Sequence, residues 1–362
     1  MKKILMLFVF PALTVLLLFT FKNDFAIAAA QTALIMQNPF NSIKYSLQND
    51  SALNVSGGID EPVENQGFDN PFADVDIDSL TPQSSAPPSP PIQPDPDHPI
   101  VEMTYSPVNN NITYNRQNCY IKNVTDYPRS EVETELLAPL DFTVEKNSDK
   151  PQILIMHTHA TESYQEHSEL YYDPAYTCRN TDTQKNMVSV GKILSDRLNQ
   201  LGYNTLHDST LHDYPNYNGS YQRSKATVES YLQKYPSIKV VLDIHRDAIE
   251  RSDGTRIKPV ITIDGKRYAQ IMIISGADNG YLNMPNFKKN LRFASHIQNS
   301  MEGMYPGFTR PILFDYRNYN QQLTTGSLLI EVGGHANTLQ EAQNSALLIA
   351  NGLAAAFDSQ NQ

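Results

Sequence analysis

The sequence predicts an α/β fold, in which a mostly parallel, twisted sheet carries helices on both faces. Three observations support this prediction. Short apolar runs at residues 152–157, 238–244 and 327–332 are long enough for buried strands and too short for most helices. Segments with apolar residues at helical spacing separate these runs. Strands that alternate with helices in this way are typical of a parallel sheet covered by helices.

Residues 1–30 have the pattern of a membrane anchor or a signal segment. Lys2 and Lys3 precede an apolar run over residues 4–21, which is just long enough to cross a bilayer. Positive charges before the run predict that the N-terminus stays in the cytoplasm and the rest is exported. Small residues at 26–30 also fit a cleavage pattern, although the length of the run favours a retained anchor. We therefore expect a cell-membrane protein with one N-terminal span and an extracytoplasmic body.

Residues 31–104 are predicted to form a disordered, acidic, Pro-rich tether. Residues 51–100 contain nine Asp or Glu and no Lys or Arg, so most of the net charge of −11 lies there. Eight prolines fall between residues 82 and 99. Such a composition buries too little apolar surface to fold and favours a semi-rigid spacer. Because the charge belongs to a tether, it argues against a nucleic-acid partner.

Residues 105–150 form a lead-in segment without a clear pattern, and residues 151–362 form the predicted catalytic domain. Whether Cys119 and Cys178 pair stays open at this stage. After the first strand, apolar spacing predicts a helix that ends at Gly202, a typical C-cap residue. The predicted elements, in order, are a strand at 152–157, a helix at 186–201, a strand at 203–207, a helix at 221–235 ended by Pro236, a strand at 238–244, a hairpin of 260–263 with 270–275 around Asp264 and Gly265, a helix at 287–304, a strand at 327–332 and an Ala-rich helix at 339–357.

Three polar clusters follow three of the apolar strands. They span residues 157–162, 243–247 and 331–335. The carboxyl ends of parallel strands share one edge of a sheet, and ligands bind at that edge. A single histidine at a strand end is usually structural, whereas three such clusters favour a metal site. Imidazoles with a nearby carboxylate are the ligands of catalytic zinc, so Zn²⁺ is the predicted cofactor.

Zinc hydrolysis requires about three protein ligands and a separate carboxylate that moves protons. His245 is the firmest predicted ligand, and Glu162 is the predicted carboxylate ligand, with a surface acid as the alternative. Of the two nearby histidines we favour His157 over His159, because His157 directly continues the strand. Asp243 is expected to orient His245 or to cap the sheet.

Glu331 is the predicted general base. An unpaired acid within an apolar strand is costly, so a functional role is expected. Gly333 and Gly334 follow it and allow the backbone to approach a ligand closely. Arg246 is predicted either to bind a substrate carboxylate or to form a structural ion pair.

The motifs HTHATESY at 157–164, HDYPNYNGSYQRS at 212–224, DIHRDA at 243–248 and EVGGHANTLQEA at 331–342 resemble the stage II sporulation protein P family. This is a family of anchored cell-wall hydrolases related to zinc-dependent N-acetylmuramoyl-L-alanine amidases. The resemblance covers roughly residue 152 to the C-terminus, and the anchor and spacer match the family's layout. It implies an amidase or zinc-exopeptidase type of α/β fold.

The resemblance also implies a function and a set of roles. The expected reaction is cleavage of the amide between muramic acid and L-alanine in peptidoglycan, together with peptide cross-links, during engulfment of the forespore. The expected partner is the membrane-bound sporulation protein D, a glycan-cleaving enzyme, at the mother-cell membrane. His157 and His245 match the metal histidines, and Glu331 matches the catalytic acid. The amidases' glutamate ligand at the next helix start is missing here, so Glu162 replaces it, with His159 as the fallback ligand.

Two other functions remain open from the sequence. One is a zinc carboxypeptidase-like exopeptidase on the same general fold. The other is a non-catalytic, anchored scaffold that binds the cell wall and recruits a partner.

Overall fold

The computed structural model describes residues 95–360 with the exception of residue 107. The predicted membrane segment at 1–30 and most of the predicted tether at 31–104 lie outside these residues. Within the described residues, no helix is both long and apolar enough to cross a bilayer.

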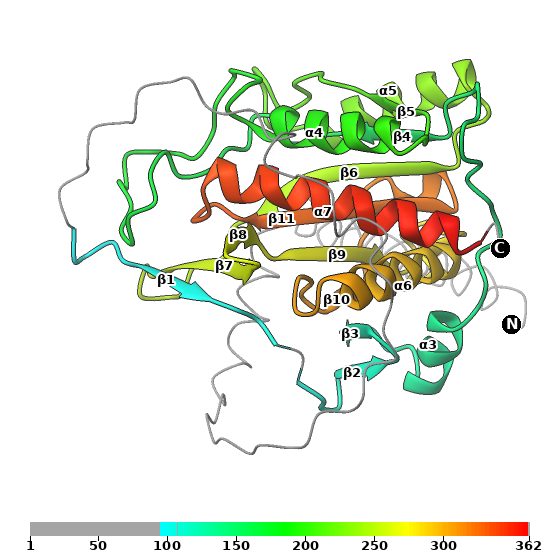
Figure 1. Cartoon of the computed structure of the whole chain (residues 1–362), viewed down its shortest axis with the longest axis horizontal. Coiled ribbons are helices and arrows are strands. Elements are labelled where there is room, and N and C mark those ends of the chain that lie inside the picture. The colour runs from blue at the N-terminus through cyan, green and yellow to red at the C-terminus, as the bar shows by residue number, and fades with distance from the viewer. Residues whose placement is uncertain (1–94, 107, 361–362) are drawn as a thin grey trace, which may run out of the picture. The chain divides into compact units, whose positions relative to one another are not determined.

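The main sheet in the described part of the chain has eight strands, in the order β2-β3-β10-β9-β11-β6-β4-β5 (Figure 1). β5, β4, β6 and β11 run parallel, and β9 pairs antiparallel with β11. β9, β10 and β3 again run parallel, and β2 is antiparallel to β3. The prediction of a mostly parallel sheet is therefore confirmed. The strand bounds are β2 Thr113–Arg116, β3 Cys119–Asn123, β4 Ile153–Met156, β5 Thr205–His207, β6 Val240–Asp247, β9 Ile271–Gly276, β10 Ile312–Asp315 and β11 Gly326–Gly334.

Helices cover both faces of this sheet, as predicted. Three of them, α4, α6 and α7, lie across one face (Figure 1). α5 covers part of the other face, where Val228 packs against Leu154, Met156 and Val241. The helix bounds are α4 Met187–Gln200, α5 Ser220–Lys234, α6 Phe287–Met304 and α7 Leu339–Asp358.

The central strand β4 is buried on both faces. Ile153 and Ile155 belong to the large core beneath α4, α6 and α7, whereas Leu154 and Met156 belong to the smaller core beneath α5. Successive side chains of a strand point to opposite faces, so a strand between two helix layers is apolar throughout. This explains the unbroken apolar run, and it fixes which face each later residue would occupy.

A second sheet has three strands, β1 (Ile100–Met103), β7 (Arg256–Ile263) and β8 (Lys266–Ala269). β1 lies within the stretch predicted to be tether, and that prediction is wrong for these residues because they pair in parallel with β7. The predicted hairpin does turn at Asp264 and Gly265. Its second strand is β8, however, and the expected strand at 270–275 is β9 of the main sheet.

The lead-in segment contributes to the main sheet. Its strands β2 and β3 extend the sheet beyond β10, and helix α3 (Arg129–Leu136) follows them. Cys119 lies in β3, and both Cys119 and Cys178 are buried free thiols. The two cysteines therefore do not pair with each other.

Candidate active site

The register of three neighbouring strands places the polar clusters on one face of the sheet. Met156 pairs with Asp243, and His245 pairs with Glu331, both in parallel register. Paired residues of parallel strands share a face, and residues two apart share a face as well. Asp243, His245 and Glu331 therefore lie on the same face as Met156, which is the α5 side, near the carboxyl ends of the strands.

The chain leaves β4 after Met156 and turns back across this edge. The turn at residues 158–161 is held by the side chain of Asp243, which accepts hydrogen bonds from the Thr158 amide at 2.8 Å and its hydroxyl at 2.7 Å. The Glu162 amide donates to the His159 carbonyl at 3.1 Å. This local geometry carries His159 and Glu162 over β6, next to His245.

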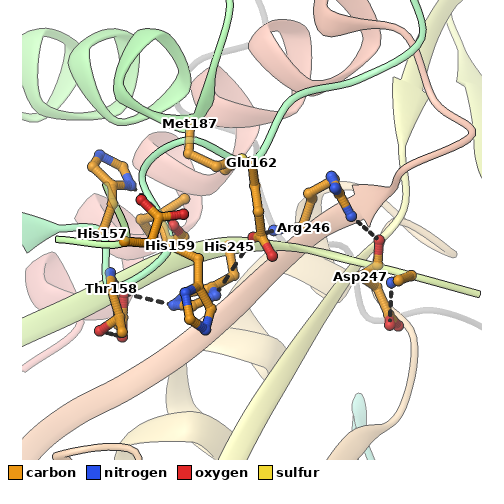
Figure 2. A network of polar contacts seen from close by, with 12 residues as sticks. His157, Thr158, His159, Glu162, Met187, His245, Arg246 and Asp247 are labelled. Carbon is orange, nitrogen blue, oxygen red and sulfur yellow. Dashed lines mark hydrogen bonds and ion pairs between the residues drawn. The ribbon is translucent and has the colours of Figure 1, made fainter. Parts of the chain in front are cut away.

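His159, Glu162 and His245 form a contacting group (Figure 2). The ring centroids of His159 and His245 are 5.2 Å apart, and Glu162 Oε2 lies 3.6 Å from His245 Nδ1. All three side chains are buried. The structure thus brings together two of the favoured candidate ligands and the fallback histidine.

His157 does not join this group, which corrects the expectation that it is the better histidine ligand. Its Nδ1 donates to the carbonyl of Ile244 at 2.9 Å, and its Nε2 lies 2.9 Å from Nε2 of His207. The ring packs beneath α4, where a Cβ on Gly191 would come within 2.4 Å of it. Figure 2 shows this ring on the other side of β6 from His159 and His245. Because Met156 is on the α5 face, the next residue in the strand direction faces the opposite way.

His245 lies between two carboxylates. Its Nε2 lies 2.8 Å from Asp243 Oδ1, and its Nδ1 faces Glu162. Burial lowers the pKa of His245, but Asp243 and Glu162 outweigh burial and raise it well above the ordinary value. Burial raises the pKa of Glu162, but His245 and Arg246 outweigh it and hold that pKa well below the ordinary range. The expectation that Asp243 orients His245 agrees with this geometry.

His159 is held by Tyr217, a residue outside the predicted set of site residues. Tyr217 stacks on the imidazole with ring centroids 4.6 Å apart, and its hydroxyl shares a hydrogen bond of 3.1 Å with His159 Nε2. His159 Nδ1 is buried and has no hydrogen-bond partner in the described part of the chain. Burial lowers the pKa of His159 to about 4. The ring is therefore neutral at pH 7 and has one nitrogen free to bind a cation.

Arg179 is a second residue that sequence reasoning missed. Its Nη1 lies 2.8 Å from Asp213, its Nη2 lies 3.6 Å from Glu162, and its guanidinium lies 4.8 Å from the centre of the Tyr217 ring. Asp213 also accepts from the Thr161 hydroxyl at 2.6 Å. The motif at 212–224 was a signal for this loop, but the sequence alone did not show that it folds over the histidines.

Glu331 is partly exposed and lies on β11 beside His245. Burial and the nearby charge of Asp247 raise the pKa of Glu331 to about 8, although His245 lowers it. Within residues 95–360, residue 107 aside, its Oε2 has no hydrogen-bond partner. A carboxyl group with these properties can hold and release a proton near neutral pH.

Arg246 is held by contacts within the chain. Its guanidinium is buried and donates to three backbone carbonyls: Ser163 at 2.6 Å, Cys178 at 2.8 Å and Asp247 at 3.2 Å. It ties the loop after Glu162 to the end of β6. These contacts fit the structural alternative better than a grip on a substrate carboxylate, although the partners are carbonyls and not an acid.

The donor set fits zinc in its chemistry, although its present arrangement is not a closed coordination sphere. In residues 95–360, leaving aside residue 107, no three His, Cys, Asp or Glu side chains are arranged to hold a metal ion as they stand. Two imidazoles and a carboxylate are nevertheless a known ligand set for catalytic zinc. Among the described residues, the buried Nδ1 of His159 has no hydrogen-bond partner, and Nδ1 of His245 faces Glu162. His159, Glu162 and His245 are therefore the residues that would hold an ion.

Comparison with known proteins gives a weak structural likeness to amidases. An N-acetylmuramoyl-L-alanine amidase, AmiC2 of Nostoc punctiforme, is 12% identical with a TM-score of 0.32, over 58% of this chain and 97% of that one. The CwlD amidase of Clostridioides difficile, solved in complex with the GerS lipoprotein, is 14% identical with a TM-score of 0.34, over 57% and 99% of the two chains. TM-scores this low support no conclusion about mechanism.

The sequence likeness is stronger. Stage II sporulation protein P of Bacillus subtilis strain 168 is 30% identical over 220 residues, which are 58% of this chain and 52% of that protein. The match thus spans about half the length of this curated relative. The model of the stage II sporulation protein P (SpoIIP) family matches residues 92–354, which include both sheets and every candidate site residue. The chain therefore belongs to the stage II sporulation protein P family.

Proposed function

We propose that the chain is a sporulation hydrolase of peptidoglycan that cleaves the amide between N-acetylmuramic acid and L-alanine. The observation that carries this proposal is the contact of His159, Glu162 and His245 at the sheet edge, with Glu331 paired to His245 on the next strand. Family membership supports a role in sporulation. The motifs of the sequence support the amide as the bond cleaved.

His159, Glu162 and His245 would hold a zinc ion, with both histidines using Nδ1. When bound, zinc supplies the Lewis acidity that activates a water and polarises an amide carbonyl. Tyr217 at Nε2 of His159, and Asp243 at Nε2 of His245, fix the proton on the nitrogen that faces away from the ion. The two rings are thereby oriented before an ion arrives.

Glu331 moves the proton in this mechanism. Its carboxylate takes a proton from the attacking water and returns it to the nitrogen of the leaving L-alanine. The raised pKa, about 8, suits this double role, because the group is a stronger base than an ordinary glutamate and still protonates an amine.

The proposal extends to the setting of the enzyme. The N-terminal segment would anchor it in the mother-cell membrane, with the described body outside the cytoplasm. Engulfment would then pair it with the glycan-cleaving sporulation protein D, and cross-link peptides would be further substrates. These parts depend on the family resemblance and on residues 1–30.

The test is digestion of purified cell wall by the zinc-loaded chain and by Glu331→Gln. We expect new L-alanine amino termini with the unchanged chain, and a loss of about 100-fold or more in Glu331→Gln at unchanged zinc content. Glu250→Gln is the matched control, because Glu250 is an exposed acid outside the histidine group. Its rate should match that of the unchanged chain.

The two rival functions give other results in the same experiment. Release of single terminal amino acids, without new L-alanine termini, would indicate an exopeptidase. A scaffold would bind wall material without a bound metal, and Glu331→Gln would then behave like the unchanged chain.

A further inference from the structure

With Arg246 committed to backbone carbonyls, Arg310 is a second buried cation at the same edge. Its guanidinium makes one ion pair, from Nη1 to Asp247 Oδ2 at 2.9 Å. Its Nε and Nη2 are buried and have no hydrogen-bond partner among the residues that the structure describes. A buried cationic donor without an acceptor is costly. Two such donors on one side chain indicate that a group from outside the chain completes the site.

The backbone of Arg310 is fixed beside the strand that carries Glu331. Its amide donates to the carbonyl of Ile271 at 2.7 Å. Ile271 and Met272 of β9 pair with Val332 and Glu331 of β11. The positive charge of Arg310 reaches Glu331, whose pKa it lowers. Arg310 therefore belongs to the same edge as the candidate catalytic group.

The position of Asp247 gives the spacing. Asp247 is two residues beyond His245 in β6, so both side chains face the same side. At about 3.3 Å per residue, Asp247 lies about 7 Å farther along the strand. Arg310, which is paired with Asp247, thus lies about 7 Å from the histidine group along the strand, which is the length of two residues in an extended peptide. Glu331, whose Oε2 also has no hydrogen-bond partner among the described residues, pairs with His245 and so lies at the histidine end of this spacing.

We propose that Arg310 binds a carboxylate of the substrate peptide, on the residue that follows L-alanine. This rests on the proposed function, because it assigns the peptide side of the cleaved amide to the Arg310 end of the edge. A guanidinium presents its Nε and one terminal nitrogen as a planar fork that matches a carboxylate. The sugar side of the amide offers hydroxyl and acetamide groups, which a desolvated guanidinium binds less strongly than a carboxylate. Arg310 is therefore a specificity-determining residue that reads the acid after L-alanine.

The experiment compares two soluble substrates with the zinc-loaded full chain. One is muramoyl-L-alanyl-D-glutamate with its γ-carboxyl capped as the methylamide, which leaves one free carboxylate after L-alanine. The other is the D-isoglutamine form with the same cap, which has a carboxamide in place of that carboxylate. Charge-assisted hydrogen bonds contribute about 1.5–3 kcal/mol, so we expect a preference of about ten-fold or more for the carboxylate, expressed in KM. Arg310→Gln should raise KM for the carboxylate substrate alone, so that the two substrates become equivalent.

Two further variants separate recognition from folding. Arg310→Lys keeps a positive charge beside Asp247 but has no fork, and it should retain only part of the preference. Arg292→Gln is the matched control, because Arg292 of α6 pairs with Glu135 of α3, away from the edge. It should leave the preference unchanged.

Equal KM values for the two substrates in the unchanged chain would overturn the inference, whatever the variants do. A preference that persists in a folded Arg310→Gln would overturn it as well. Cleavage of neither substrate, with cell wall also left intact, would contradict the proposed function itself. Cleavage of both without discrimination would contradict only the role of Arg310.

Discussion

At the scale of single residues, the two histidines of the HTH motif have different environments despite their closeness in sequence. His157 is enclosed by α4 and hydrogen-bonded to the backbone of β6, and burial with the neighbouring His207 lowers its pKa to about 3. His159 lies on the other side, between Tyr217 and His245. The first residue stabilises the fold, and the second is available to an ion.

This difference predicts opposite effects of two alanine substitutions. His157→Ala should lower the free energy of unfolding by about 2–4 kcal/mol, because it leaves a cavity and an unpaired Ile244 carbonyl, and it should retain zinc. His159→Ala should lose zinc with a smaller effect on stability. Urea unfolding of the metal-free proteins and metal analysis of the loaded ones would check both. A folded His157→Ala that cannot bind zinc would contradict the assignment.

At the scale of elements, the end of β11 is held in place by a tight turn. Gly333 has φ of +65°, and a Cβ at this position would lie 2.6 Å from Asn337 Oδ1 and 2.7 Å from the Cβ of Ala269. The same Asn337 side chain accepts from the Gly334 amide at 2.8 Å and donates to the carbonyl of Pro259 at 3.1 Å. The turn therefore connects the strand of Glu331 to the second sheet.

Gly333→Ala should destabilise the protein more than Gly265→Ala does. Gly265 is the matched control, since its φ is +78° but a Cβ there would meet nothing within 4 Å. Gly265→Ala should cost about 1–2 kcal/mol from backbone strain alone. Gly333→Ala adds the clash and should cost about 2 kcal/mol more. Thermal or urea unfolding would measure the two; equal losses would show that the contacts of Gly333 have no energetic weight.

The second sheet also shows how a polar segment is fixed. β1 has exposed residues and no clear apolar pattern, yet it pairs with β7. Lys258 of β7 is 2% exposed and lies 3.5 Å from Glu102 of β1 and 3.1 Å from Glu341 of α7. Residues more than eighty positions away in sequence determine that β1 forms a strand. The composition of β1 alone therefore indicated a tether.

At the scale of the whole molecule, the candidate site should make stability depend on pH. The folded pKa of Glu331 is about 8, above its ordinary value of 4.5. Between these values the folded state keeps a proton that the unfolded state has lost, so stability falls as pH rises through this window. The loss of stability caused by Glu331 is absent below about pH 4.5 and complete above about pH 8.

In the metal-free protein, Glu331→Gln should remove the loss of stability that ionisation of Glu331 causes. Relative to the unchanged chain, the variant should gain stability on the order of 2 kcal/mol between pH 5 and pH 8, a value reduced for the partial exposure of Glu331. Urea unfolding at the two pH values, with a chelator present, measures the difference. A constant difference between the two proteins would contradict the raised pKa.

The sequence by itself determined the fold class and the sheet edge at which the site is proposed. The strands β4, β6 and β11 and the polar clusters after them follow from local apolar patterns, because a strand buried on both faces must be apolar throughout. His245 and Glu331 were identifiable as candidates because they are chemically costly residues near the ends of buried strands, and Glu162 because it belongs to the polar cluster that follows β4.

Only the tertiary structure decided which side chains meet. The choice between His157 and His159 depends on the pairing of Met156 with Asp243 and on a turn held by Asp243, neither of which is encoded in local periodicity. The roles of Arg246 and Arg310 depend on whether distant acceptors satisfy their donors. Spacing along the chain restricts the face of a residue only while the strand continues, and contacts between segments far apart in sequence decide everything beyond its end.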